Sequence, residues 1–192
     1  IYNTAIPFLE NAGINVCVLR SDFTYLDYFY SQIKRGNRNG KIRGFPLCGM
    51  CGICRDCKLP PIKEYQKKLS QETIQYIGIA KDEQERLLRL KDNCISLLDK
   101  YGVKEEGSKE ICKKAGLLSP IYEFTERGGC FFCPNAKEKE LRHLYDNHPE
   151  LWAKMLELQS VPNKCTELFN RTMTFADIDF NFRIDDAQMK WF

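Results

Sequence analysis

Six of the ten cysteines gather in two short segments of the chain. The stretch "CGMCGICRDC" has a thiol at every third position, and "CFFCP" adds a pair far downstream. The residues are Cys48, Cys51, Cys54, Cys57, Cys130 and Cys133. A Cys-x2-Cys turn can direct two sulfurs and backbone N–H groups toward one ion, and two such pairs complete a four-coordinate site. The spacing therefore favours metal ligation, with redox-active, disulfide-bonded and inert thiols as the alternatives.

The same spacing is compatible with two kinds of metal centre. Tetrahedral zinc needs four thiolates, which two Cys-x2-Cys pairs supply. The upstream run also contains a ferredoxin-like Cys-x2-Cys-x2-Cys, which takes its fourth ligand from elsewhere, often from a Cys followed by Pro. Cys133 is such a residue, because Pro134 follows it. Zinc and a [4Fe–4S] cluster both remain open from the spacing alone.

The remaining candidate ligands stand alone in the sequence. We expect Cys17, Cys94 and Cys165 to be small buried apolar residues. His143 and His148 have no metal-ligand spacing from a cysteine, so we expect structural or surface roles for them.

Composition narrows the class of protein. The 192 residues are 43% hydrophobic and 29% charged, as in a globular chain with a core. A chain of this size does not need disulfides, so the cysteines favour a reducing, cytoplasmic setting. No run of about 18 apolar residues is present, so we expect no membrane partner. A net charge of +3 is too small to indicate nucleic acid by itself.

One local basic run is more suggestive than the net charge. "KRGNRNGKIR", Lys34–Arg43, is rich in Gly and Asn and predicts a mobile loop. Such a loop could contact phosphates, although simple solvation is the favoured interpretation.

The elements that must position these residues follow from apolar patterns. Unbroken apolar runs predict two strands, Asn15–Leu19 and Thr73–Ile79, as parallel neighbours in a sheet. Helices are predicted before Gly13, in "FTYLDYFYSQIK", after Pro60, in "KDEQERLLRLK", before Gly116 and over Lys137–Leu158. The tail, with its alternating Phe and Asp, is predicted to cover the rest. A strand followed by a turn and a helix is the unit of an α/β sheet, whose ligands lie beyond the carboxyl ends of the strands.

Three stretches, taken in order, resemble one family. "YIGIAKDEQERLLRL" is similar to the Gly-x-x-x-Asp-Glu-x-x-Arg segment of the phosphoadenosine phosphosulfate (PAPS) reductase family, in the PP-loop adenine-nucleotide α-hydrolase superfamily. "GICRDCKLPPIKEY" resembles its Cys-x3-Lys-x2-Pro-Ile/Leu segment. "ICKKAGLLSPIYEFTERGGCFFCPN" resembles the Cys…Gly-Leu…Ser-Pro-Ile-Tyr…Arg-x-Gly-Cys-x-x-Cys-Pro segment of its bacterial and phage-type branch. The resemblance implies an α/β fold of PP-loop (HUP-like) type: a partial parallel sheet flanked by helices, with a helical C-terminal part and a Cys-rich metal-binding loop.

The resemblance also implies site residues. Asp82, Glu83, Arg86 and Arg127 would face an adenine nucleotide (ATP or PAPS-like) or a second substrate, and Lys58 would contact a phosphate or sulfonate. By position alone, the first three follow a predicted strand. In the alternative interpretation they have no ligand and are charges at a helix end that interact with the helix dipole.

For the metal, the resemblance favours one quartet because its Cys-x3-Lys segment matches Cys54, and Cys57 is the nearest two-residue partner of Cys54. The preferred ligands are Cys54, Cys57, Cys130 and Cys133, with Cys48, Cys51 and Cys112 as substitutes.

The chain departs from the family pattern in three places. The phosphate-binding Ser-Gly-Gly-x-Asp-Ser loop is absent, and we expect it to precede Ile1. Residues 1–158 would then form a PAPS-reductase-like domain without its N-terminal segment, followed by a covering segment, 159–192. No cysteine follows Cys165 to form the Glu-Cys-Gly motif of true reductases, and Ala80 stands where they carry Arg.

These observations lead to two functional hypotheses. In the first, the chain is the C-terminal part of a PP-loop protein that binds an adenine nucleotide for nucleotidyl transfer, sulfur transfer or reduction, and this part alone is inactive. The enzyme class would be sulfonucleotide reductase or ATP-pyrophosphatase-like. In the second, the chain is a metal-stapled, non-enzymatic module that binds a partner or nucleic acid through Lys34–Arg43.

Overall fold

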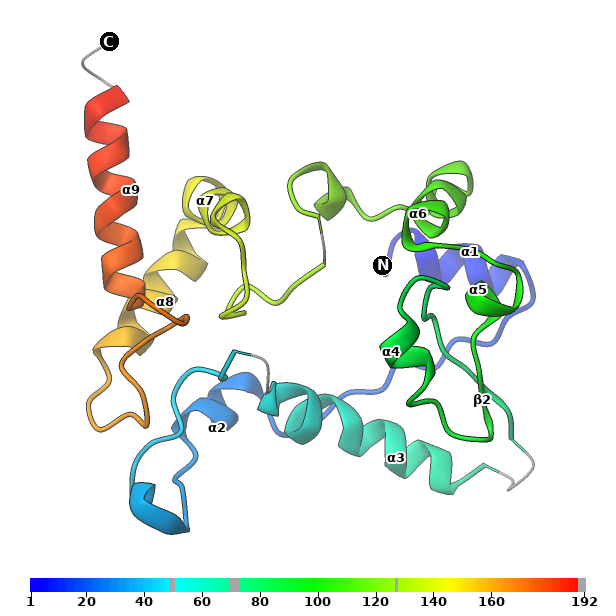
Figure 1. Cartoon of the computed structure of the whole chain (residues 1–192), viewed down its shortest axis with the longest axis horizontal. Helices are drawn as coiled ribbons and strands as arrows, with labels where there is room; N and C mark the ends of the chain where they lie inside the picture. Colours follow the sequence, from blue (N-terminus) through cyan, green and yellow to red (C-terminus); the bar gives the residue numbers. More distant parts are fainter. Residues whose placement is uncertain (49–50, 70–72, 127, 190–192) are drawn as a thin grey trace. The chain divides into compact units, whose positions relative to one another are not determined.

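The computed structural model describes residues 1–48, 51–69, 73–126 and 128–189 and divides into two compact units (Figure 1). Unit 1 comprises Ile1–Val18 and Glu64–Pro120, and unit 2 comprises Leu19–Lys63 and Ile121–Phe192. Each unit is therefore built from two segments that are distant in the sequence. The predicted tail, 159–192, belongs to unit 2 together with residues 121–158.

Unit 1 combines short helices with a small parallel sheet. Its elements are α1 (Ala5–Asn11), β1 (Gln75–Tyr76), α4 (Gln84–Leu87), β2 (Cys94–Ile95), α5 (Leu97–Lys100) and α6 (Glu105–Lys114). β1 pairs with β2 in parallel, with Gln75 opposite Cys94 and Tyr76 opposite Ile95. The predicted mixed α/β class is confirmed at this level, as helices together with a small parallel sheet, and the PP-loop type stays a prediction.

The predicted strand pairing is wrong. Asn15–Leu19 is irregular, and the apolar side chains of Val18 and Leu19 are 48% and 38% exposed. A strand needs a partner for its backbone N–H and C=O groups, and β1 finds that partner in β2 instead. The run Thr73–Ile79 contributes only the two residues of β1 to the ladder.

The interior of unit 1 is small. Ile79, Ala80 and Ser96 are buried, and the Ser96 hydroxyl donates to the Ile79 carbonyl at 2.5 Å. The same hydroxyl accepts from the Asp99 amide at 3.3 Å and so caps the start of α5. By contrast, the side chain of Leu88 is 85% exposed. Local capping and hydrogen bonds, rather than a broad apolar core, stabilise this unit.

Unit 2 is mainly helical. Its elements are α2 (Tyr25–Tyr30), the 3-10 turn η1 (Gly36–Arg38), the π-helical turn η2 (Cys54–Lys58), α7 (Glu138–Asn147), α8 (Pro149–Ser160) and α9 (Phe175–Met189). Two further elements, α3 (Leu59–Lys67) and η3 (Pro120–Glu123), span the boundaries between the units. α8 packs against both α7 and α9 (Figure 1).

The core of unit 2 lies among these helices. Its largest fully buried side chains are Phe29, Phe45, Phe169, Phe175, Met155 and Leu158. The apolar face predicted along Lys137–Leu158 is buried at Leu141, Leu144, Trp152, Met155 and Leu158. The prediction of one continuous helix there is wrong, because the chain turns at His148 before α8 begins. Pro149 explains the break, since proline disfavours helical backbone in the preceding residue and suits the first position of a new helix.

The tail contains α9, which packs against α8. Phe175, Ile178 and Phe182 are buried on one face at helical spacing, although Phe and Asp alternate in the sequence. The buried Trp152 indole N–H donates to Asp179 at 2.7 Å and joins α8 to α9.

The basic run Lys34–Arg43 forms the end of a hairpin rather than a free loop. The Ile33 amide donates to the Lys41 carbonyl and the Arg43 amide to the Ser31 carbonyl, both at 2.9 Å. Ile42 in turn donates to Asn163 at 2.9 Å and accepts from the Cys165 amide at 2.7 Å. The hairpin is therefore hydrogen-bonded to the segment after α8.

Within the described residues, no helix has the length and apolar character that crossing a membrane requires.

Candidate functional site

The two cysteine segments meet in unit 2. The Cys48 thiol donates to the Pro134 carbonyl at 3.4 Å, and the Lys58 ammonium donates to the Cys130 sulfur at 3.8 Å. These contacts join residues more than seventy positions apart at both ends of the upstream run. The two cysteine segments are therefore in contact at these two points, and the four-sulfur site that they were predicted to share stays a prediction.

The downstream pair forms the tight turn that its spacing predicts. The Cys133 amide donates to the Cys130 carbonyl at 2.9 Å. Between the two cysteines, Phe132 stacks on Tyr25 with ring centroids 3.6 Å apart, and Phe131 meets the same ring edge-on. Burial raises the pKa of the Tyr25 hydroxyl far above its usual value. The turn is thus anchored to the core by the two residues between its thiols.

The upstream run enters a π-helical turn, η2, that continues into α3. Single π turns inside helices are frequent at functional sites. Within η2 the Cys57 thiol donates to the Thr24 carbonyl at 3.5 Å. Its partial burial raises the pKa of Cys57, as do the nearby Asp56 and Asp27 carboxylates, while Lys58 acts in the opposite direction. The raised pKa favours the protonated thiol of Cys57.

The donor types fit a thiolate-bound metal, but the sulfurs point to different partners. Cys48 faces a carbonyl, Cys57 faces another carbonyl, and Cys130 faces Lys58. In the described part of the chain, no three Cys, His, Asp or Glu side chains form a group arranged to hold a metal ion. The quartet Cys54, Cys57, Cys130 and Cys133 stays a prediction.

Other predicted thiols and imidazoles are placed as follows. None of the ten cysteines is in a disulfide. Cys112 lies in α6 of unit 1, whereas the two cysteine segments belong to unit 2. The prediction of a buried Cys17 is wrong, because this residue is exposed in the irregular segment described above, and Cys94 and Cys165 are half-buried. His143 stacks on Phe124 with ring centroids 4.2 Å apart, which fits a structural role.

The residues predicted at a nucleotide site make local contacts in unit 1. Asp82 accepts from the Glu105 amide at 3.1 Å, at the first residue of α6. Glu83 accepts from the Ala80 amide at 3.1 Å and forms an ion pair with Arg86. The Arg86 hydrogen bond and the Ala80 amide lower the pKa of Glu83. A nucleotide site predicts that these side chains are open to solvent rather than mutually paired, and for Glu83 and Arg86 that prediction is wrong.

Lys58 and Arg127 were the other two residues predicted to contact the nucleotide. Lys58 lies in unit 2, where its ammonium contacts the Cys130 sulfur. Arg127 lies outside the described residues.

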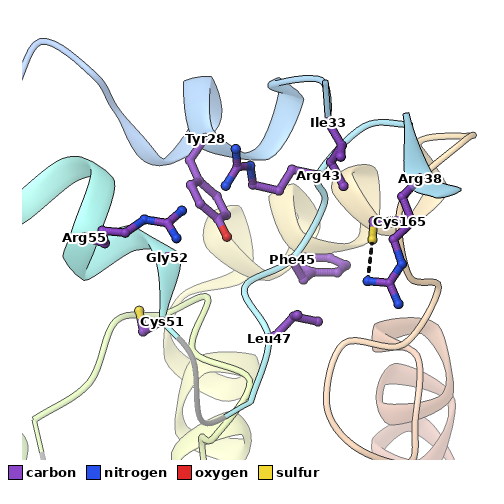
Figure 2. A pocket seen from close by; sticks show the side chains of 10 residues that line it. All are labelled: Tyr28, Ile33, Arg38, Arg43, Phe45, Leu47, Cys51, Gly52, Arg55 and Cys165. Carbon is purple, nitrogen blue, oxygen red and sulfur yellow. Dashed lines mark hydrogen bonds between the residues drawn. The ribbon is translucent and has the colours of Figure 1, made fainter. Parts of the chain in front are cut away.

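A pocket of about 450 Å³ in unit 2 brings together residues that sequence reasoning did not connect. It is lined by Tyr28, Ile33, Arg38, Arg43, Phe45, Leu47, Cys51, Gly52, Arg55 and Cys165. Figure 2 shows Arg43 and Arg55 beside Tyr28, and Arg38 beside Cys165 on the other side of Phe45. The volume is within the usual range for small-molecule sites.

The pocket connects the basic hairpin with the cysteine run. Tyr28 lies so close to Gly52 that a Cβ atom there would contact the phenol oxygen and come within 2.6 Å of the ring Cε2. Only glycine allows this approach. The basic run Lys34–Arg43 was a sequence signal for Arg38 and Arg43. No such signal pointed to Arg55 or Cys165 as pocket residues. Cys165 is 127 positions from its partner Arg38.

Comparison with protein-family models, with curated proteins and with solved structures finds no match for this chain.

Proposed function

We propose that the chain is a PAPS-reductase-like protein whose cysteine-rich unit 2 holds zinc or a [4Fe–4S] cluster and which takes part in adenine-nucleotide chemistry, either nucleotidyl transfer or sulfur transfer. The observation that carries the metal part is the contact of the two cysteine segments at Cys48–Pro134 and Lys58–Cys130. The nucleotide part is supported by the resemblance of the three sequence stretches.

The residues around the thiols suit metal binding in their electrostatics. The Lys58 ammonium beside Cys130 would offset part of the negative charge that thiolates bring to one ion. The Thr24 carbonyl accepts from the Cys57 thiol, and this hydrogen bond would be given up when the sulfur loses its proton. Because the pKa of Cys57 is raised, metal binding should release a proton and weaken as the pH falls.

A bound zinc ion would supply a structural link between the two segments, and a cluster would add an electron reservoir. The chain's own contribution is to present thiols from two sides. The downstream turn is held against the core by Phe132 on Tyr25. The run 48–57 must then close onto it.

The test is metal analysis of the full chain purified without oxygen, with a visible spectrum. We expect about one zinc or about four iron atoms per chain. Changing Cys130 and Cys133 together to Ser should abolish the metal content and lower the melting temperature by about 2–4 °C for each kcal/mol lost.

The matched control is Cys17→Ser, which removes an exposed thiol outside both cysteine segments and should leave the metal in place. A double variant that keeps its metal would reject the proposed site.

The nucleotide part has a separate test in a chain that includes the phosphate-binding loop. Arg86→Ala should weaken adenine-nucleotide binding by about 1.5–3 kcal/mol, as expected for the loss of a charge-assisted hydrogen bond. Unchanged affinity by calorimetry would assign Arg86 to its ion pair with Glu83 alone.

A further inference from the structure

The pocket beside the basic hairpin combines apolar walls with more positive than negative charge. Three guanidinium groups line it, from Arg38, Arg43 and Arg55. A carboxylate next to it, Asp56, pairs with Arg55 at 2.6 Å and with Arg43 at 3.4 Å. Three cations and one anion leave a net excess of two positive charges.

The three arginines differ in how fully they are paired. Arg43 also donates to Ser31 at 3.0 Å, and its guanidinium carbon lies 4.8 Å from the centroid of the Tyr28 ring. Arg38 instead donates to the Cys165 sulfur at 3.2 Å. Among the described residues no carboxylate pairs with Arg38. A thiol is a weak acceptor, so most of the hydrogen-bonding capacity of this guanidinium remains for a ligand.

The apolar part of the lining suits a flat group. Phe45 and Leu47 lie between Arg38 on one side and Tyr28 with Arg43 on the other (Figure 2). The exposed Leu47 side chain and the flat guanidinium groups favour a planar ring, and arginine forks match the oxygens of a phosphate. The pocket thus offers an anion contact and a ring contact within one space of about 450 Å³.

We propose that this pocket binds a small phosphate ester that carries a planar ring, with Arg38 as the principal phosphate contact and the exposed Leu47 side chain beneath the ring. The ligand chemistry overlaps with that of the proposed function. The site, however, uses none of the cysteines of the preferred metal quartet and none of Asp82, Glu83 and Arg86, so its failure would leave the metal proposal standing.

The test is calorimetry on the full chain with four probes: AMP, ribose 5-phosphate, adenosine and a short single-stranded oligonucleotide. AMP carries both groups, whereas the next two probes each lack one. We expect AMP to bind more tightly than ribose 5-phosphate, adenosine to bind more weakly than both, and AMP affinity to fall as salt rises.

Arg38→Gln should weaken AMP binding by roughly tenfold or more, because it removes a charge-assisted hydrogen bond. The matched control is Arg35→Gln, which removes an equal charge from the same hairpin at an exposed position that does not line the pocket. This control should change AMP affinity less than about twofold, as a screened surface charge does.

Leu47→Asp gives a second variant at a half-exposed side chain, so folding should survive, and its carboxylate should repel the phosphate. Circular dichroism and the melting temperature check that each variant is folded. Three results would overturn the proposal: no AMP binding at millimolar concentration, equal losses for Arg35→Gln and Arg38→Gln, or an oligonucleotide preferred over AMP.

Discussion

The hydrophobic core cluster of the described chain is drawn from unit 2, with Phe29, Met155, Leu158 and Phe175 fully enclosed. Unit 1 buries only Ile79 and Ala80 among its described apolar residues. Apolar burial contributes about 25 cal/mol per Å² and is the main stabilising term in folding. We therefore expect most of the folding stability of this chain to come from unit 2, the unit that also carries the cysteine segments and the arginine pocket.

The largest effect should come from the centre of the unit 2 core. Phe175→Ala removes a fully buried ring that contacts Trp152 and Phe169, and should lower the free energy of unfolding by about 3–5 kcal/mol. The counterpart in unit 1 is Leu88→Ala, at a side chain that is 85% exposed, with an expected change within about 0.5 kcal/mol. Urea denaturation measures both. Similar losses for the two variants would break the contrast between the units.

A smaller effect should come from Gly52, where the cysteine run touches α2. Gly52→Ala places a methyl group against the Tyr28 ring, and overpacking of this kind costs about 1–3 kcal/mol. If the cause is the ring, adding Tyr28→Ala should remove most of the penalty of Gly52→Ala in a double-mutant cycle. Additive losses would instead assign the effect to the backbone of the cysteine run.

The smallest effect concerns Asp56 and should depend on pH. Its hydrogen bond with Arg55, opposed by burial and assisted by the charges of Arg55 and Arg43, lowers the pKa of Asp56. A lowered folded-state pKa stabilises the fold above the unfolded value of about 4, and this contribution is lost as the pH falls through the folded value. Wild type should therefore exceed Asp56→Asn in stability at pH 7, and the difference should shrink below about pH 4. A difference that is constant with pH would show that the charge of Asp56 contributes nothing.

The sequence predicted the parts of the fold that depend on local or periodic signals. The buried face from Leu141 to Leu158 follows helical periodicity, and the Cys130–Cys133 turn follows from its spacing. The strand Asn15–Leu19 was mispredicted because an apolar run does not specify a partner, and the short β2 has no periodic signal.

The candidate sites show the same division. The contact of the two cysteine segments could be predicted because both carry the same ligand spacing. The arginine pocket could not, because Arg38 meets Cys165 where backbone hydrogen bonds of Ile42 join the hairpin to Asn163 and Cys165. Tertiary pairing across such a separation leaves no pattern in a single sequence.

The central claim is that unit 2 is the more stable unit and also binds the metal. Amide hydrogen exchange of the metal-loaded chain, measured before and after chelation, tests this claim most directly. We predict that amides of α8 exchange slowest and that the β1–β2 amides, such as Ile77 bonded to Ile95, exchange much faster. Removing the metal should speed exchange around Cys133 and Ala136, whose amides close the downstream turn, and leave β1–β2 unchanged. Equal protection in the two units, or chelation that changes β1–β2 but not the turn, would contradict the account.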